Sequence, residues 1–195
     1  MRVLVACEYS GRVRSAFRAL GHDAWSCDLE PAADLSPYHY QDDCMDVILE
    51  GWDLVIAHPP CTHLSSSGAK HWAAKRADGR QQQGIDLFRA IQKACALHAR
   101  GWCIENPVGI MSTLWRAPDQ IIPPWMFGDE ARKTTCLWLS GSLPLLVADR
   151  IVGQGELRPL PDGRTMPAWY TTKGKHRSVT FPGIARAMAE QWGGK

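Results

Sequence analysis

A hydrophobic strand that stops at two prolines constrains this sequence more than any other feature. Residues 53–57 form an apolar run, and the chain then reads His58-Pro59-Pro60-Cys61. Proline fixes its own φ angle and has no backbone N–H, so the strand ends there and its exit is rigid. We therefore expect a strand end that holds a cysteine in a fixed position.

The rest of the chain alternates short apolar runs with helical patterns. Strands are predicted at residues 2–7, 24–27, 53–57, 102–104 and 134–139. Helices are predicted at residues 13–20, 84–98 and 182–192. This alternation implies an α/β fold with a doubly wound, mostly parallel, Rossmann-like sheet and helices on both faces.

Helical spacing also predicts which side chains face the core. In residues 84–98 we expect Leu87, Ile91, Ala94 and Leu97 on the buried face. In residues 182–192 we expect an inward face made of Ile184, Ala185, Met188 and Trp192. Residues 114–129 are rich in proline and tryptophan and predict an extended connection. Residues 141–168 show little periodicity, and we expect a loop with at most one hairpin.

Composition limits the organisation and the class of the protein. The chain has 195 residues, 45% of them hydrophobic, which suits a single domain over residues 1–195. A net charge of +2 is too small to indicate a nucleic-acid binder by itself, so any basic surface must be local. No apolar run approaches the roughly 20 residues of a membrane span, and the N-terminus does not read as a signal peptide.

The seven cysteines are scattered, with no CxxC pair. This pattern argues against a disulfide framework and against a standard zinc site, so we expect no metal and a reducing cytoplasmic location. Most of the cysteines are expected to be small buried hydrophobes, namely Cys7, Cys27, Cys95, Cys103 and Cys136.

The first predicted turn is a candidate cofactor site. In doubly wound sheets, ligands bind beyond the carboxyl ends of the strands, where a glycine turn lets backbone N–H groups approach them. Ser10-Gly11 occupies that place, and Asp28 ends the second strand, where an acid commonly binds ribose hydroxyls. Asp43 precedes the next apolar segment and is a candidate for an adenine amino group. The glycine fingerprint is incomplete, so a turn glycine with two solvated acids is the alternative.

Cys61 and Glu105 are the candidate catalytic pair. A thiol that attacks carbon must be held near its target, and the two prolines before Cys61 provide a rigid backbone. Glu105 follows the predicted strand at residues 102–104, and a protonated glutamate there could donate to a ring nitrogen. A crossover helix fits between the two strands, so both groups are expected at one edge of adjacent parallel strands.

These residues resemble the DNA cytosine C5-methyltransferase family. His58-Pro59-Pro60-Cys61 looks like that family's Pro-Cys nucleophile motif, and Glu105-Asn106-Pro107 looks like its Glu-Asn motif. Near the end, Arg177-Ser178-Val179 is similar to the family's closing Asn-Ser-Val motif. The resemblance covers roughly residues 2–140 and 175–192. The family's large target-recognition region is replaced here by a short, loop-rich insertion at 141–175.

The resemblance implies a covalent methyl transfer that uses S-adenosyl-L-methionine. Cys61 would add to C6 of cytosine while Glu105 holds or protonates N3, and C5 would then accept the methyl group. Asn106 would orient the loop that carries the cysteine. The implied cofactor-binding set is Glu8, Ser10, Gly11, Asp28, Asp43, Pro60, Ser178 and Val179.

The same resemblance assigns basic residues to the substrate, which is DNA or a cytosine nucleotide. Lys70, Arg76 and Arg80 follow Cys61 and are expected to face phosphates, with a solvated helix face as the alternative. Lys133 stands near a family arginine that helps hold the base, and Arg177 stands where the family has asparagine. With so little recognition region, we expect poor reading of duplex sequence, a preference for exposed cytosines, or a protein partner for targeting. The compact form would suit a bacteriophage gene acting in the host cytoplasm.

Three other interpretations remain open from the sequence. A catalytically degenerate methyltransferase fold would bind nucleic acid without chemistry. An amino-methyltransferase has a similar Pro-Pro motif, but it has an acid or amide where His58 stands and an aromatic residue where Cys61 stands. A Cys–His hydrolase would pair Cys61 with His58 or His63, although no oxyanion turn is evident. The sequence predicts no oligomeric state.

Overall fold

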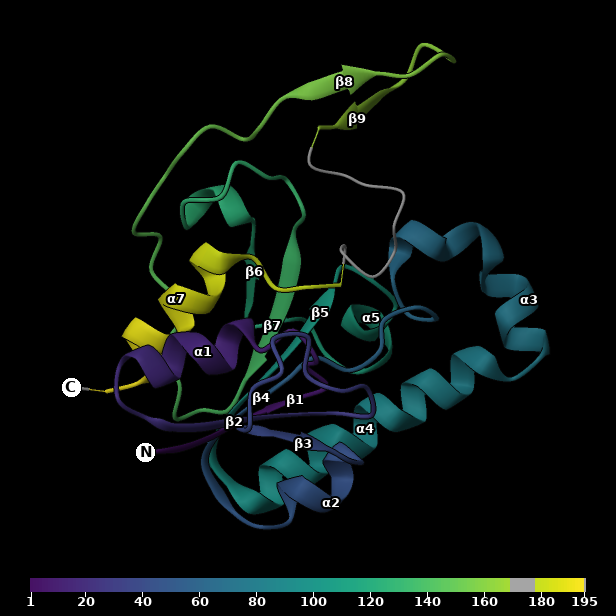
Figure 1. Ribbon diagram of the computed structural model, residues 1–195. Helices are drawn as coiled ribbons and strands as arrows, with labels where there is room; N and C mark the ends of the chain where they lie inside the picture. The colour runs from purple at the N-terminus through teal and green to yellow at the C-terminus, as the bar shows by residue number, and fades with distance from the viewer. Residues whose placement is uncertain (169–177, 195) are drawn as a thin grey trace.

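The computed structural model describes residues 1–168 and 178–194 as an α/β arrangement of a seven-stranded sheet with helices on both faces (Figure 1). The strands of this sheet are β1 (Arg2–Ala6), β2 (Asp23–Asp28), β3 (His39–Gln41), β4 (Trp52–Ala57), β5 (Ala99–Pro107), β6 (Gln120–Ile122) and β7 (Thr135–Leu139). The longer helices are α1 (Arg12–Ala19), α4 (Arg80–His98) and α7 (Pro182–Trp192). Shorter helical segments are α2 (Cys44–Ile48), η1 (Ser66–His71), α3 (Trp72–Ala77), α5 (Met111–Leu114) and η2 (Pro124–Met126).

The sheet is mixed but mostly parallel. Its strand order is β3-β2-β1-β4-β5-β7-β6, and the pairs from β3 to β5 are all parallel. β7 pairs antiparallel with both β5 and β6. The predicted α/β class with a mostly parallel sheet is therefore confirmed, and the sheet is compatible with a Rossmann-like fold. The sequence predicted the strand that forms β7, but strand propensity does not reveal its antiparallel direction.

The strand order turns back on itself between β1 and β4. From β1 the chain proceeds outward through β2 and β3, and it then returns to place β4 on the other side of β1. Such a switch point leaves a crevice at the carboxyl ends of the two central strands, because their following loops diverge in opposite directions. The candidate cofactor site lies in the turn after β1, and the Pro-Pro-Cys segment lies in the turn after β4.

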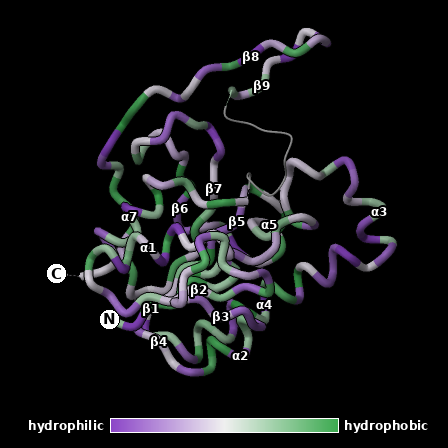
Figure 2. The backbone as a smooth tube through the Cα atoms, viewed as in Figure 1, coloured by the Kyte–Doolittle hydropathy of each residue, from purple (hydrophilic) through white to green (hydrophobic). Residues whose placement is uncertain are grey.

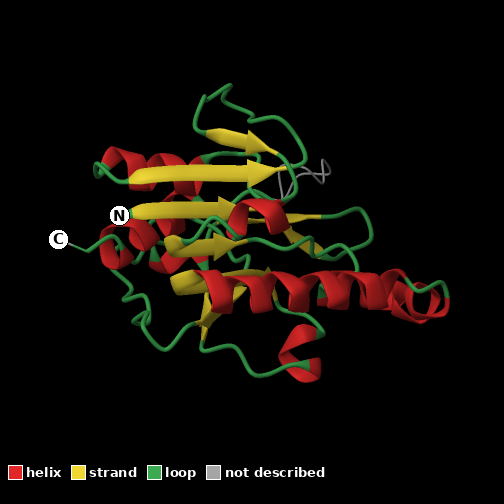
Figure 3. Ribbon diagram, turned by 90° about the horizontal axis from the view of Figure 1, so that it is seen from below, coloured by secondary structure: helices red, strands yellow, loops and turns green. Residues whose placement is uncertain are grey.

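Two hydrophobic clusters sandwich the sheet. One joins α1 and α7 to one face, through residues such as Val13, Phe17 and Met188. The other joins α2 and α4 to the opposite face, through residues such as Ile48 and Phe88. Central strands β1 and β4 are buried on both faces, as expected for parallel strands covered by helices. Figure 3 shows the long helix α4 running along one side of the sheet.

The α7 prediction is confirmed, whereas the predicted face of α4 is wrong in part. Ile184, Ala185, Met188 and Trp192 of α7 are all buried. On α4, Ile91 and Ala94 are buried as expected, but the fractional exposure is 37% for Leu87 and 69% for Leu97. The buried positions of α4 include Ile85, Phe88, Ile91, Ala94 and Cys95.

The apolar residues of α4 fit two overlapping stripes, one that contains the exposed Leu87 and Leu97 and one that contains the buried Phe88. Figure 2 shows that hydrophobic and hydrophilic residues both occur along this helix. Helical spacing fits either stripe, and contact with the sheet selects the one that contains Phe88.

The remaining segments differ in detail from the sequence-based expectations. β5 runs to Pro107, so Glu105 lies within the strand, which is held by β4 on one side and β7 on the other. Residues 114–129, expected to be extended, contain β6 and η2. β8 (Leu157–Pro159) and β9 (Thr165–Pro167) form the single hairpin allowed for residues 141–168, and this hairpin projects from the body (Figure 1).

Among residues 1–168 and 178–194, no helix combines the length and the apolar character needed to cross a membrane.

Candidate active site

A cleft of about 1040 Å³ opens at the carboxyl ends of the parallel strands. Its walls come from the segments after β1, β2 and β4, from the end of β5, and from residues 178–180. Ten of the residues assigned to the site from sequence line it, namely Glu8, Ser10, Asp28, Pro60, Cys61, Glu105, Asn106, Lys133, Ser178 and Val179. Five do not: Gly11, Asp43, Lys70, Arg76 and Arg80. Arg177 lies outside the described residues.

The turn that carries Cys61 is fixed from a neighbouring strand. Asn106, 2% exposed, donates its side-chain amide to the carbonyl oxygen of Pro59 at 2.7 Å. The backbone N–H of His58 donates to Ala6 O at 2.9 Å, and the carbonyl of Cys61 accepts from Leu64 and Ser65. The cysteine therefore lies at a turn whose two sides are both hydrogen-bonded, which is the rigidity that the prolines predict.

The surroundings of Cys61 favour its neutral thiol. Burial raises the pKa of Cys61, the negative charge of Glu105 raises it further, and Lys133 lowers it. The thiol is only partly buried and faces the cleft. The conversion of the Cys61 thiol to a thiolate therefore depends on the charges that surround it.

Both oxygens of the Glu105 carboxyl group are engaged. His58 Nδ1 lies 3.0 Å from Glu105 Oε2, and Thr135 donates its hydroxyl to Glu105 Oε1. The side chains of His58 and Glu105 are only 10% and 15% exposed. The strand ends of β4, β5 and β7 thereby meet at one carboxyl group, which is held in a single orientation.

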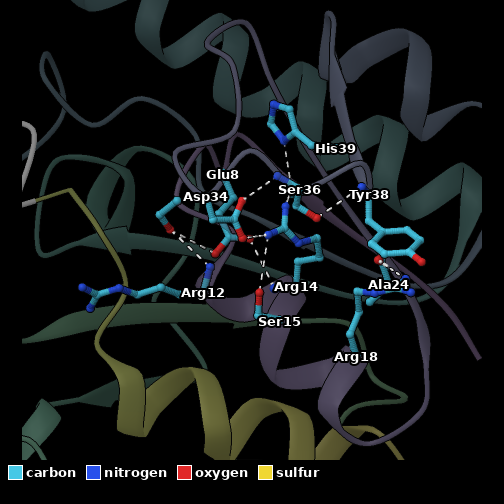
Figure 4. A network of polar contacts seen from close by, with 12 residues as sticks. Glu8, Arg12, Arg14, Ser15, Arg18, Ala24, Asp34, Ser36, Tyr38 and His39 are labelled. Carbon is cyan, nitrogen blue, oxygen red and sulfur yellow. Dashed lines mark hydrogen bonds and ion pairs between the residues drawn. The ribbon is translucent and has the colours of Figure 1, made fainter.

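Glu8 caps the start of α1. Its carboxylate accepts hydrogen bonds from the backbone N–H groups of Val13 at 2.7 Å and Arg14 at 3.3 Å, and it is 4% exposed. Burial raises the pKa of Glu8, while His58 and the two N–H groups lower it. Figure 4 shows Glu8 and Arg14 together at the beginning of this helix. Glu8 thus has a clear structural role besides the cofactor role expected from sequence.

Gly11 shapes the same turn without facing the cleft. Its φ of 67° is left-handed, and a Cβ at this position would collide with the guanidinium of Arg14. That guanidinium is buried and hydrogen-bonds to Ser26 and Asp34. Gly11 therefore permits the turn that brings Glu8 and Ser10 to the cleft.

The two acids proposed for the cofactor lie in different places. Asp28, at the end of β2, lines the cleft, and its Oδ1 accepts from Glu30 N at 3.0 Å. Asp43 is exposed and caps α2 by accepting from Met45 N at 2.9 Å. The local sequence before an apolar segment suits a helix cap as well as a ligand contact, and the structure shows the cap.

The basic residues downstream of Cys61 lie on the surface and do not line the cleft. Lys70 lies in the last turn of η1 and Arg76 in the last turn of α3, both exposed, while Arg80 is paired with Asp78 at the start of α4. Lys75, a neighbour in sequence, is buried instead, and its ammonium donates to Thr62 O at 2.6 Å. One lysine thus anchors the segment after Cys61, and the others remain accessible to a ligand.

Sequence reasoning missed three residues at or beside the cleft. His58 lines the cleft but was considered only as a partner of Cys61. Thr135 was not considered, and it does not line the cleft, yet both residues bind Glu105. Cys7, expected to be buried, lines the cleft with a φ of 58°, and its sulfur lies 3.6 Å from that of Cys44. Position at a strand end was the available signal for His58 and Cys7.

Comparison with known proteins assigns no family, because no family model and no curated protein matches the chain. All seven cysteines are free thiols. Within residues 1–168 and 178–194, no group of three or more His, Cys, Asp or Glu residues could hold a metal ion.

Proposed function

We propose that this protein is an S-adenosylmethionine-dependent methyltransferase that acts on C5 of cytosine in DNA through a covalent adduct with Cys61. The observation that carries the proposal is the shared cleft of Cys61 and Glu105, with Asn106 fixing the Pro-Pro-Cys turn from the strand that bears Glu105. A partly buried thiol in the same cleft as an oriented carboxyl group suits nucleophilic attack coupled to proton transfer on a heterocycle.

The cleft also supports a nucleotide-like cofactor. Its volume of about 1040 Å³ exceeds the upper end of the range common for small-ligand sites, about 1,000 Å³, so it can hold a cofactor and a base together. Ser10 and Asp28, from the ends of β1 and β2, would hold the ribose and amino acid portions. Ser178 and Val179 line the same cleft and would complete that side.

The chemistry follows from the roles of the chain's own residues. Cys61 releases its proton to water, and its sulfur forms a bond to C6 of cytosine as the C5–C6 double bond opens. Glu105 gives a proton to N3, which leaves the ring electron-rich at C5. When bound, S-adenosylmethionine supplies the methyl group that C5 accepts. Water then takes the proton from C5, and the C5–C6 double bond re-forms as the bond from Cys61 to C6 breaks. The sulfur leaves as a thiolate that takes up a proton from water, and N3 returns its proton to Glu105.

Lys133 would assist the first step. Its positive charge lowers the pKa of Cys61, against the effects of burial and of Glu105.

The experiment that tests the proposal is adduct trapping. The wild-type protein is incubated with S-adenosylmethionine and a single strand, a duplex or a nucleotide that contains 5-fluorocytosine, whose C5 fluorine cannot leave as a proton. We expect a protein–nucleic acid adduct that peptide mass spectrometry places on Cys61. A non-fluorinated series of duplex, single strand and dCMP measures the preferred substrate.

Two variants complete the design. Cys61→Ser should abolish the adduct, whereas Cys95→Ser, on the distant helix α4, should retain it. Methyl transfer retained by Cys61→Ser would contradict the covalent mechanism and would favour an amino-methyltransferase. Binding of nucleic acid without cofactor binding in calorimetry would favour the degenerate alternative.

A further inference from the structure

We infer that His58 is a positioning residue that stabilises the ionised form of Glu105 during proton exchange with the base. The inference rests on the proposed function for its chemistry and on the His58–Glu105 contact for its geometry. The ring follows β4, whose register with β5 sets Ala57 beside Ile104 and therefore brings the next residues together. The resulting Nδ1 to Oε2 distance is 3.0 Å.

The contact identifies which nitrogen carries the proton. A carboxylate oxygen accepts hydrogen bonds, so His58 Nδ1 must donate when Glu105 is ionised. His58 Nε2 is buried and has no hydrogen-bond partner among the described residues. The Nδ1–H tautomer places the single proton of a neutral ring on the nitrogen that has an acceptor, and it avoids an unpaired buried N–H group.

This donor acts on the charge that the reaction creates. When Glu105 gives its proton to N3, its O–H bond breaks, an N–H bond forms on the base, and a carboxylate remains. His58 Nδ1–H and the Thr135 hydroxyl both point at that carboxylate, and hydrogen bonds to a charged form favour it. The two donors lower the cost of protonating N3 and keep the carboxyl group oriented for the proton's return.

The charged surroundings of the pair come from three other elements. Glu8 faces His58 from the turn after β1, and an imidazolium at His58 lowers the pKa of Glu8. Cys61 faces Glu105 from the turn after β4, and Lys133 approaches from the segment before β7. His58 thus lies between a carboxyl group of the cofactor turn and the carboxyl group that would act on the base.

The kinetic test uses His58→Ala and His58→Asn with the trapping and methyl-transfer assays. We expect His58→Ala to lower kcat and the rate of adduct formation by on the order of 10²-fold, as for loss of one preorganised donor, with KM and cofactor affinity little changed. The asparagine amide can place a donor near the former Nδ1, so His58→Asn should recover part of the rate.

A control variant distinguishes this role from a general effect of replacing a hydrogen-bonded histidine. His39 is hydrogen-bonded through both ring nitrogens, but it lies in the edge strand β3 and does not line the cleft, so His39→Asn should leave kcat near wild type. Equal rates for wild type and His58→Ala, or a loss confined to KM, would overturn the inference while leaving the proposed function standing.

A second measurement does not depend on activity. Nitrogen-15 NMR of wild type should show the Nδ1–H tautomer for His58, with a protected proton that disappears in Glu105→Ala. An Nε2–H tautomer would contradict the inference even if the protein is inactive on every cytosine substrate. Failure of wild type to trap 5-fluorocytosine, with the NMR result intact, would instead reject the proposed function.

Discussion

Asn106 donates its side-chain amide to the carbonyl oxygen of Pro59 at 2.7 Å and so ties the end of β5 to the turn before Cys61. The two residues are 47 positions apart, and the parallel pairing of β4 with β5 brings them together. Because the amide is buried, nothing else can readily satisfy the carbonyl if the side chain is removed.

Replacing Asn106 should therefore destabilise the protein and disturb the turn before Cys61. Asn106→Ala is expected to lower the free energy of unfolding by about 1–3 kcal/mol, the usual cost of an unsatisfied buried polar group. Urea denaturation measures the change. Gln191→Ala is the control, because its amide also binds a backbone carbonyl, that of Val147 at 2.9 Å, but near solvent. An equal or larger loss in the control would contradict the role given to burial.

The reactivity of Cys61 should follow its charged neighbours. Alkylation requires the thiolate, and burial and Glu105 raise the pKa of Cys61, so iodoacetamide should react slowly at neutral pH and faster as pH rises. Glu105→Gln removes a negative charge and should speed the reaction at neutral pH, whereas Lys133→Met should slow it. Peptide mass spectrometry follows the site, and Glu50→Gln, near the opposite end of β4, should have no effect.

The left-handed turn at Gly11 should not tolerate a side chain. Gly11→Ala is expected to cost more than the roughly 1–2 kcal/mol of the left-handed backbone, because its Cβ also meets the Arg14 guanidinium. Gly21→Ala is matched to it, since Gly21 has a φ of 83° and no atom near an added Cβ. The losses of unfolding free energy in the two variants, measured by thermal or urea unfolding, should differ by the cost of that collision. Equal losses in the two variants would show that the collision has no cost.

Glu8 should give stability a defined pH dependence. Burial raises its pKa in the folded protein above the ordinary value, so the folded state holds the proton more tightly than the unfolded state does. The stabilisation from this protonation is complete below the ordinary glutamate pKa and is lost as pH rises through the raised pKa. Relative to Glu8→Gln, wild type should lose unfolding free energy over that window. Glu30→Gln is the control at an exposed position. If the unfolding free energies of wild type and Glu8→Gln change in the same way with pH, the assignment is contradicted.

The exposed side chain of Lys70 should contribute to binding of single strands. If Lys70 contacts one phosphate, Lys70→Ala should weaken binding at low salt and reduce the magnitude of the salt slope by about 0.7. Fluorescence anisotropy with a labelled oligonucleotide over a salt series measures this slope. Lys93→Ala, on α4, is the control of equal charge change, and an unchanged slope in Lys70→Ala would remove Lys70 from the substrate surface.

Local sequence patterns predicted the helices and strands well where each pattern fitted only one structure. The run ending at Ala57 forms β4, and Pro59-Pro60 closes it as proline chemistry requires. The residues predicted to face inward on α7 are all buried, and burial extends further to Gly183, Ala187 and Ala189. On α4 two stripes compete, and Leu87 lies on the one that the sheet does not cover.

The candidate site also has features that follow from local sequence and features that depend on the fold. Neighbouring residues were enough to predict that a cysteine leaves β4 on a rigid turn and that Glu105-Asn106 lies at the end of the next strand, although β5 extends beyond both residues. Asp43 caps a helix outside the cleft through a local contact, which its sequence allowed as well as a ligand contact. The folded arrangement was needed to bring Asn106 to the Pro59 carbonyl and to bring His58 and Thr135 to Glu105. Those relationships depend on strand order and register, which are set by the burial of whole strands and helices together and which no short segment of sequence encodes.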